Sequence, residues 1–382
     1  DPKECWARLA EHSIARYAPL AAESGVEFFS EVGLLIFGVR DAFVRETQRV
    51  AARMGTRLEQ LGPEELRARF PWLSPPPETQ LGLLQTSQAG TLSPRKLCQA
   101  QLRVATARGA SHIEAAAESV SQGDGPGPLA VTLADGRVVR AENVLVAAGV
   151  YSSLLPLLPE EVLVSLTGAQ ALLAEVSAET AARLAEMPSM IFEAEREEEC
   201  VYILPPIWYP DGSWLLKVGP STAFSPPLRT RAEVDAWFKR GHLDEAFADV
   251  ALGLLRTLLP SVEVLGWRPL LCVTDSTPTE NPYIDLLAPG WGVCTGGNGW
   301  AAKSSDEIGL LAAQMMALPS HWGGGPDLPR EWFRAVTPEA LRPGPQLATA
   351  LACVEACGSV MLDRVLDALD VLTSLVAASP RL

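Results

Sequence analysis

The stretch WRPLLCVTDSTPTENPYIDLLAPGWGVCTGGNGWAAKSSDEIG, residues 267–309, decides the class of fold. Cys272 precedes nine polar and turn-forming residues, TDSTPTENP, which we predict to form an exposed turn. A structural cysteine normally lies among apolar neighbours, so a cysteine that enters a polar turn suggests a chemical role. Residues 291–295 then form an apolar run typical of a strand, and residues 303–317 have the pattern of a helix.

Three glycines, Gly296, Gly297 and Gly299, lie between that strand and that helix. Glycine lets the backbone approach a ligand closely, and a helix N-terminus offers N–H donors to an anionic or electron-rich cofactor. The alternative is a tight strand-to-helix turn that needs positive φ angles. The spacing differs from GxGxxG, so it does not match the dinucleotide-binding fingerprint.

Two further segments contain candidate residues. In VLVAAGVYSS, residues 144–153, the continuous apolar strand is typical of a parallel or otherwise fully buried sheet. It ends in small residues up to Gly149, which would admit a cofactor or merely a crossing helix. In GSWLLKVGPST, residues 212–222, Lys217 stands in an apolar strand. Lysine is rarely placed there without a partner, although an outward-facing position on an alternating strand is the alternative.

The rest of the chain mixes helices and strands without an internal repeat. We predict helices at residues 4–24, 41–54, 63–70, 93–108, 231–239 and 243–259. We predict strands at residues 111–115, 169–176, 201–204 and 214–219, and hairpins at 26–39 and 129–140. An amphipathic tail from residue 339 predicts a helix for packing or dimerisation.

Composition narrows the class of protein. The chain has 382 residues, of which 48% are hydrophobic and 20% charged, as in a globular protein with two domains. The net charge of −15 argues against nucleic acid or an anionic membrane as partner. Apolar runs are too short to cross a bilayer. Seven scattered cysteines and four histidines predict neither a metal site nor a disulfide framework, and favour a reducing, cytoplasmic location.

Five motifs together resemble one family, the FAD-dependent amino-acid oxidases of D-amino-acid oxidase (DAO) type, in the monomeric sarcosine oxidase branch. The motifs are EVGLLIFG (31–38), SQAGTLSPRKL (87–97), VLVAAGVYSSLL (144–155), LLKVG (215–219) and CVTDSTPTENPYID (272–285). The resemblance covers most of the chain and ends near Met316. The family's first strand, GxGxxG turn and helix, which bind the FAD pyrophosphate, do not occur in this sequence.

The resemblance implies roles for particular residues. Cys272 would carry a covalent thioether to the flavin, and Lys217 would face the flavin and promote reaction with oxygen. The glycine cluster would wrap the flavin ring. The lysine that binds the substrate carboxylate in this branch falls near Ala301, which makes Lys303 the candidate. The histidine that follows the strand of Lys217 in this branch is replaced by Ser221.

The resemblance also implies an architecture and a reaction. We expect a mixed α/β fold with an FAD domain from residues 84–160 and 262–335, a substrate domain from 1–83 and 161–261, and a helical tail at 336–382. The expected reaction oxidises the C–N bond of an amino acid or N-methyl amino acid, with oxygen as acceptor. Two alternatives remain: a non-catalytic homologue or fragment, and a flavin dehydrogenase that uses another acceptor.

Overall fold

The computed structural model describes residues 1–123, 127–220 and 223–339. Residues Asp1–Ala335 form one compact unit and residues Val336–Leu382 form a second. The helical tail expected from residue 339 onward lies almost wholly outside the described residues. The two-domain division within residues 1–335 stays a prediction.

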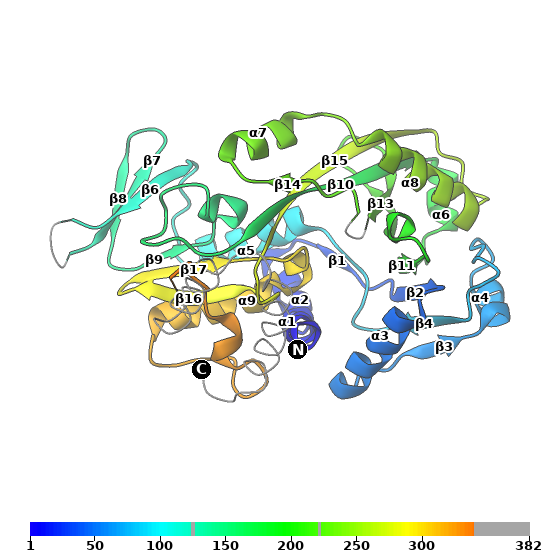
Figure 1. Cartoon of the computed structure of the whole chain (residues 1–382), viewed down its shortest axis with the longest axis horizontal. Coiled ribbons are helices and arrows are strands. Elements are labelled where there is room, and N and C mark those ends of the chain that lie inside the picture. The colour runs from blue at the N-terminus through cyan, green and yellow to red at the C-terminus, as the bar shows by residue number, and fades with distance from the viewer. Residues whose placement is uncertain (124–126, 221–222, 340–382) are drawn as a thin grey trace, which may run out of the picture. The chain divides into compact units, whose positions relative to one another are not determined.

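The first unit is a mixed α/β structure, which confirms the expected fold class (Figure 1). The helices among the described residues are α1 (Pro2–Ile14), α2 (Tyr17–Ser24), α3 (Asp41–Met54), α4 (Pro63–Arg69), α5 (Pro94–Ala107), α6 (Ala178–Arg183), α7 (Arg231–Lys239), α8 (Glu245–Leu258) and α9 (Ala301–Ala317). Short 3₁₀ helices occur at Gly149–Ser152, Glu197–Glu199 and Arg330–Phe333.

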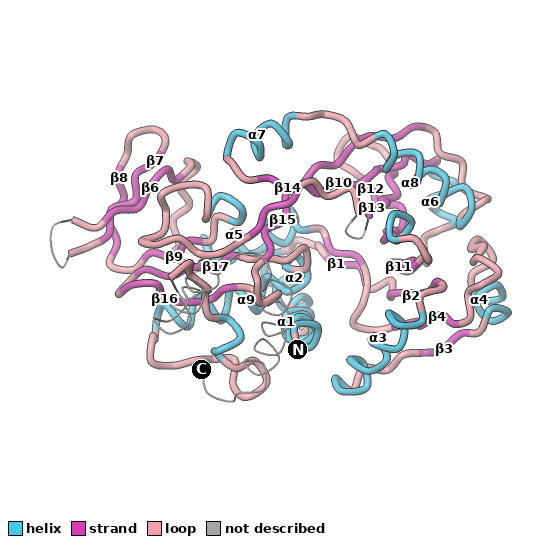
Figure 2. The backbone as a smooth tube through the Cα atoms, in the orientation of Figure 1, coloured by secondary structure: helices cyan, strands magenta, loops and turns pink. Residues whose placement is uncertain are grey.

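The strands form one large sheet and three small ones (Figure 2). The large sheet has the order β14-β10-β13-β12-β11-β2-β4-β3, and β15 pairs with residues 165–175 of β10 along the other edge of that strand. Its strands are β2 (Leu34–Gly38), β3 (Glu59–Leu61), β4 (Leu81–Gln85), β10 (Ser165–Val176), β11 (Ser189–Glu193), β12 (Val201–Trp208), β13 (Trp214–Pro220), β14 (Pro227–Leu228) and β15 (Gly266–Ser276).

The small sheets involve the segments that carried the sequence motifs. They are β16-β17-β9, β6-β7-β8 and β1-β5. Their strands are β1 (Phe29–Ser30), β5 (Thr91–Leu92), β6 (Ala117–Ser121), β7 (Leu129–Leu133), β8 (Val138–Ala141), β9 (Val144–Val146), β16 (Tyr283–Ala288) and β17 (Trp291–Thr295). The apolar strand β9 pairs in parallel with β17, as its sequence indicated.

The two faces of the large sheet differ, because side chains of a strand alternate between faces. Leu216 and Val218 of β13 are fully buried on the face that packs against α8. In Figure 1, α7 and α8 lie above this sheet and α3 lies below β2 and β4. The second face, which carries Ile36 and Ile191, borders the candidate site.

A separate core joins the beginning of the unit to its end. Trp6 and Leu9 of α1 pack with Ile308 and Leu311 of α9 over β16. The burial of this apolar surface holds α1 beside the strand–glycine–helix segment, although the two are far apart in sequence. The structure therefore places the N-terminal helix next to the glycine cluster.

Several predicted elements differ from the structure. Residues 4–24 form two helices, because α1 ends at Ile14 and α2 begins at Tyr17. Residues 26–39 do not form a hairpin, since β1 pairs with β5 whereas β2 lies between β11 and β4. Gly33, with a φ of +84°, redirects the chain between these two sheets. The strand expected at 111–115 lies instead at β6.

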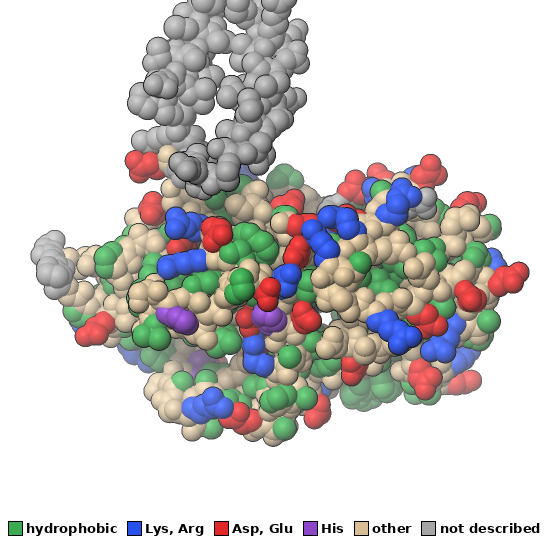
Figure 3. Space-filling model, turned by 90° about the horizontal axis from the view of Figure 1, so that it is seen from below, with side chains coloured by type: hydrophobic (Ala, Val, Ile, Leu, Met, Phe, Trp, Pro, Cys, Tyr) green, Lys and Arg blue, Asp and Glu red, His purple; other side chains and the backbone are tan. Residues whose placement is uncertain are grey.

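The surface carries charges of both signs. On the face shown in Figure 3, Lys and Arg side chains are interspersed with Asp and Glu side chains. Within the described part of the chain, the helices are all too short or too polar to span a membrane.

Candidate functional site

The glycine cluster forms a tight connection from β17 to α9. Gly296 and Gly299 have φ angles of +79° and +74°, and Asn298 between them has a φ of +48°. These left-handed conformations are strained for most residues with a side chain. The alternative explanation of the glycines, a turn that needs positive φ, is therefore observed, and close approach to a ligand stays a prediction.

A buried carboxylate holds this loop in place. Asp275 accepts hydrogen bonds from the hydroxyl of Thr295 (2.8 Å) and from the backbone N–H groups of Gly296 (2.7 Å) and Gly297 (2.9 Å). The amide side chain of Asn298 in turn accepts from the N–H of Thr277 (2.9 Å). The Gly296 and Gly297 donors thus point at Asp275, and contact of the glycine cluster with the flavin stays a prediction.

This arrangement also corrects the expectation of an exposed turn after Cys272. Residues 274–276 continue strand β15, and Asp275 is only 9% exposed. Thr277 and Asn281 are also buried. The segment packs beneath the glycine loop, where Asp275 and Thr277 find hydrogen-bond partners instead of water.

We expect Asp275→Asn to loosen the glycine loop. The amide NH₂ group would oppose N–H donors that now meet a carboxylate, and hydrogen bonds to charged groups contribute about 1.5–3 kcal/mol each. Urea unfolding should show a loss of about that size in the free energy of unfolding, and binding of carboxylate ligands should weaken. Asp285→Asn is the matched control, because Asp285 accepts from the backbone N–H groups of Leu286 and Ala335. Equal effects of both variants on ligand binding would contradict the assignment.

Lys217 lies on the second face of the large sheet. Tyr202 of β12 pairs with Ile191 of β11 on one side and with Gly219 of β13 on the other, so these three residues share one face of the sheet. Lys217 shares that face because it lies two residues from Gly219 along β13. Its side chain is half-buried, with the ammonium 5.2 Å from the centre of the Tyr202 ring. Lys217 thus stands on the sheet face that borders the site, and its role toward the flavin stays a prediction.

The strand register places Cys272 on the same face. Cys272 of β15 pairs with Ala169 of β10, and Lys217 of β13 pairs with Leu173 of the same strand. Ala169 and Leu173 are four residues apart and therefore share a face, and their partners share it with them. The thiol is exposed and lies outside any disulfide. The next residue, Val273, points to the opposite face, where it packs against Trp237 of α7.

The glycine loop closes over this part of the face. A Cβ atom at Gly299 would lie 3.8 Å from the methyl group of Thr274, which shares a face with Cys272. Gly149 adjoins the start of the loop, since its carbonyl accepts from the Thr295 hydroxyl at 3.1 Å. The structure thus brings Cys272, Gly149 and the loop to one region, with Lys217 on the same sheet face.

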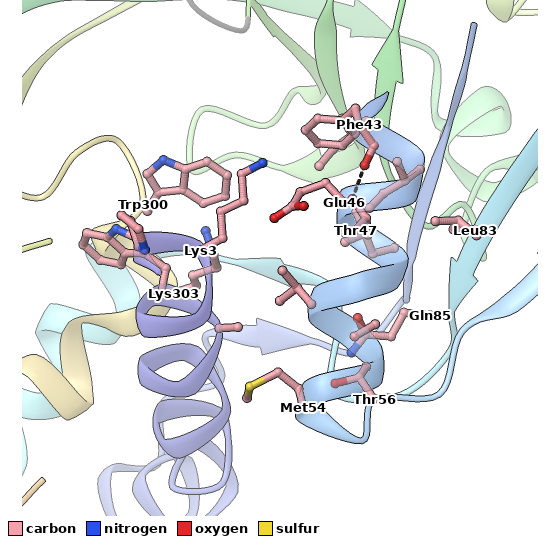
Figure 4. Close-up of a pocket in the computed structure, with 18 of the residues that line it drawn as sticks. Lys3, Phe43, Glu46, Thr47, Met54, Thr56, Leu83, Gln85, Trp300 and Lys303 are labelled. Atoms are coloured by element: carbon pink, nitrogen blue, oxygen red, sulfur yellow. Dashed lines mark hydrogen bonds between the residues drawn. The ribbon is translucent and has the colours of Figure 1, made fainter. Parts of the chain in front are cut away.

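Lys303 lies in a cavity of about 590 Å³ (Figure 4). Lys303 and Trp300 lie on one side of the cavity, and α3 forms the opposite side with Phe43 and Met54. The ammonium of Lys303 is 4.4 Å from the centre of the Trp300 ring. The side chain is accessible from the cavity, but the surrounding protein desolvates its charge and lowers the pKa of Lys303 to about 8.

Sequence reasoning missed three parts of this site. The polar residues around Asp275 predict an exposed turn, and no motif includes Trp300 between the glycines and the helix. The apolar face of α3 had no assigned role, although Phe43, Thr47, Val50 and Met54 recur at helical spacing. That spacing was a usable signal for a wall, but the glycine loop facing it is distant in sequence.

The comparison with protein families gives one match, to the model described as "DAO: FAD dependent oxidoreductase", over residues 1–315. The match spans most of the chain, so this protein belongs to the DAO family of FAD-dependent oxidoreductases. It is an FAD-dependent enzyme, and the family resemblance noted in its motifs is confirmed. No curated protein sequence matches the chain.

Solved structures with the same fold share little sequence with the chain. The open form of NikD, an unusual amino acid oxidase essential for nikkomycin biosynthesis, superposes with a TM-score of 0.66 at 19% identity, covering 87% of this chain and 83% of that one. L-proline dehydrogenase from P. horikoshii gives 0.67 at 15%, covering 86% and 81%. Glycine oxidase from Bacillus cereus ATCC 14579 gives 0.61 at 16%, covering 82% and 81%.

The residues of the site fit a flavin. A Cβ atom at Gly149 would meet no atom within 4 Å, and at Gly299 it would meet only the Thr274 methyl group, so both glycines border open space. The exposed thiol of Cys272 stands on the same side of the sheet as Thr274. A planar flavin ring would therefore meet backbone that it can approach and a thiol that it can contact.

Proposed function

We propose that this enzyme oxidises the C–N bond of an amino acid or N-methyl amino acid and passes the electrons to oxygen. FAD supplies the acceptor for the hydride that leaves the substrate carbon. Lys303 binds the substrate carboxylate, and Lys217 provides positive charge for the reaction with oxygen. Cys272 and the backbone at Gly149 and Gly299 hold the flavin.

One observation supports this proposal above the others. Lys303 places a cation inside a largely apolar cavity, directly after the glycine loop that borders the flavin region. Among the described residues, no ion pair is recorded for its ammonium, which rests on the Trp300 ring. A desolvated ammonium group without a carboxylate partner suits a ligand that brings its own carboxylate.

The acceptor and the substrate are tested separately. The FAD-loaded protein is mixed with a set of primary and N-methyl amino acids without oxygen, and the loss of flavin absorbance is followed. We expect bleaching by members of this set and stoichiometric peroxide once oxygen is admitted. Bleaching without peroxide would assign another acceptor, and no bleaching by any amino acid would refute the proposed substrate class.

We expect ligand binding to depend on the protonation of Lys303. With a pKa of about 8, the ammonium form predominates below pH 8 and is lost above it. The affinity for a carboxylate ligand without an amine should therefore be constant between pH 6 and about 7.5 and weaken progressively above pH 8. Isothermal titration calorimetry with such a ligand avoids interference from the substrate's own amine.

Variants of Lys303 provide the controls. Lys303→Ala should weaken carboxylate binding about tenfold or more, since a charge-assisted hydrogen bond contributes about 1.5–3 kcal/mol. It should also abolish the loss of affinity above pH 8, whereas Lys303→Arg should move that loss beyond the accessible pH range. An unchanged pH profile in Lys303→Ala would show that another group binds the carboxylate.

A further inference from the structure

The cavity that contains Lys303 is as large as a typical small-molecule site. Its volume is about 590 Å³. The volume falls within the range of about 300–1,000 Å³ that is typical of drug-sized ligands.

The wall opposite Lys303 is apolar. It consists of one face of α3, with Phe43, Val50, Ala51 and Met54, and of the sheet residues Ile36 and Leu83. The four α3 side chains are only half-buried. Covering such apolar surface with an apolar group of a ligand removes it from water, which favours binding.

The charged groups on the α3 side do not alter this character. The Glu46 carboxylate accepts a hydrogen bond from Arg49 at 2.9 Å, so its charge is paired within the helix. Lys3 lies at the same end of the cavity, with its ammonium 6.0 Å from the centre of the Phe43 ring. Among the described α3 side chains that line the cavity, no carboxylate is therefore unpaired for a cationic substrate side chain.

We propose that the substrate is an amino acid with a bulky, uncharged apolar side chain, branched aliphatic or aromatic, bound with its carboxylate at Lys303 and its side chain against α3. This inference rests on the proposed function, because it names the substrate class of the same site. A cation on one side of the cavity and an apolar wall on the other side favour a ligand that has both an anionic end and an apolar end.

The first test is binding without turnover. The probes are 3-phenylpropanoate and acetate, which share the carboxylate but differ in apolar surface, measured by isothermal titration calorimetry on the FAD-loaded protein. We expect 3-phenylpropanoate to bind at least tenfold more tightly than acetate, since burial of apolar groups in a pocket is worth at least that factor. Equal affinity for both probes would overturn the proposal.

Neighbouring alanines of α3 provide a matched pair of variants. Ala51 lines the cavity, whereas Ala52 is exposed and is not part of the lining. Ala51→Trp should weaken 3-phenylpropanoate binding at least tenfold by filling the space in front of the wall, and Ala52→Trp should leave it unchanged. Because the substitution and the helix are the same, a loss in both variants, or in neither, would refute the assigned wall.

The second test is turnover. The value of kcat/KM for phenylalanine, leucine and their N-methyl forms should exceed that for glycine and sarcosine at least tenfold. Faster turnover of the small amino acids would overturn the assignment of the bulky class while the proposed function stands. Tight binding of 3-phenylpropanoate without oxidation of any amino acid would refute the proposed function and support the cavity's specificity.

Discussion

We expect the Cys272→Ser variant to release all of its flavin when it is denatured, whereas the wild type should keep it. In the wild type, the FAD-loaded protein is denatured in acid and separated from small molecules, and flavin absorbance should remain with the polypeptide. We expect this because Cys272 is exposed, stands on the same sheet face as Thr274 and lies near the glycine loop. Covalent attachment would replace one S–H and one C–H bond by an S–C bond, and oxygen would accept the two electrons and two protons released.

The other described cysteines are poorer candidates for this bond. The reactive form is the thiolate, and burial raises the pKa of the Cys5 and Cys294 thiols to about 12. Cys98 is exposed but lies on α5, so Cys98→Ser is the matched control and should retain the flavin. Release of all flavin from the denatured wild type would show that the cofactor is bound without a covalent link.

Lys217→Met is expected to slow the reaction of the reduced enzyme with oxygen by about 100-fold or more, which is the usual cost of removing one stabilising group from a reacting centre. Negative charge develops as oxygen accepts electrons, and Lys217 supplies a cation on the sheet face that borders the site. Reduction by substrate should change far less. Stopped-flow absorbance measures the two half-reactions separately.

Two variants distinguish charge from folding in this prediction. Lys217→Arg keeps the positive charge and should restore much of the oxygen reaction. Lys239→Met removes an exposed lysine at the end of α7 and should change neither half-reaction. Equal slowing of reduction and reoxidation in Lys217→Met would show that the residue acts on the structure of the site and not on the oxygen step.

Local sequence patterns determined most elements of the fold. α3 and α7 begin and end where periodicity and capping indicated, and β17 and β9 follow their apolar runs. These elements depend on interactions between near neighbours, which a sequence displays directly. The motifs around Cys272 and Lys217 were sufficient to indicate the family, which the family match over residues 1–315 confirms.

Only the tertiary structure decided the pairing of strands and the composition of the site. Gly33 sends β2 into the large sheet instead of into a hairpin, and Asp275 is buried under a loop that begins 21 residues downstream. A polar segment is read from its sequence as exposed, because the donors that satisfy its carboxylate lie elsewhere in the chain. For the same reason the apolar face of α3 became a cavity wall only when α1, α9 and the sheet packed around it, which is a result of long-range burial and not of local pattern.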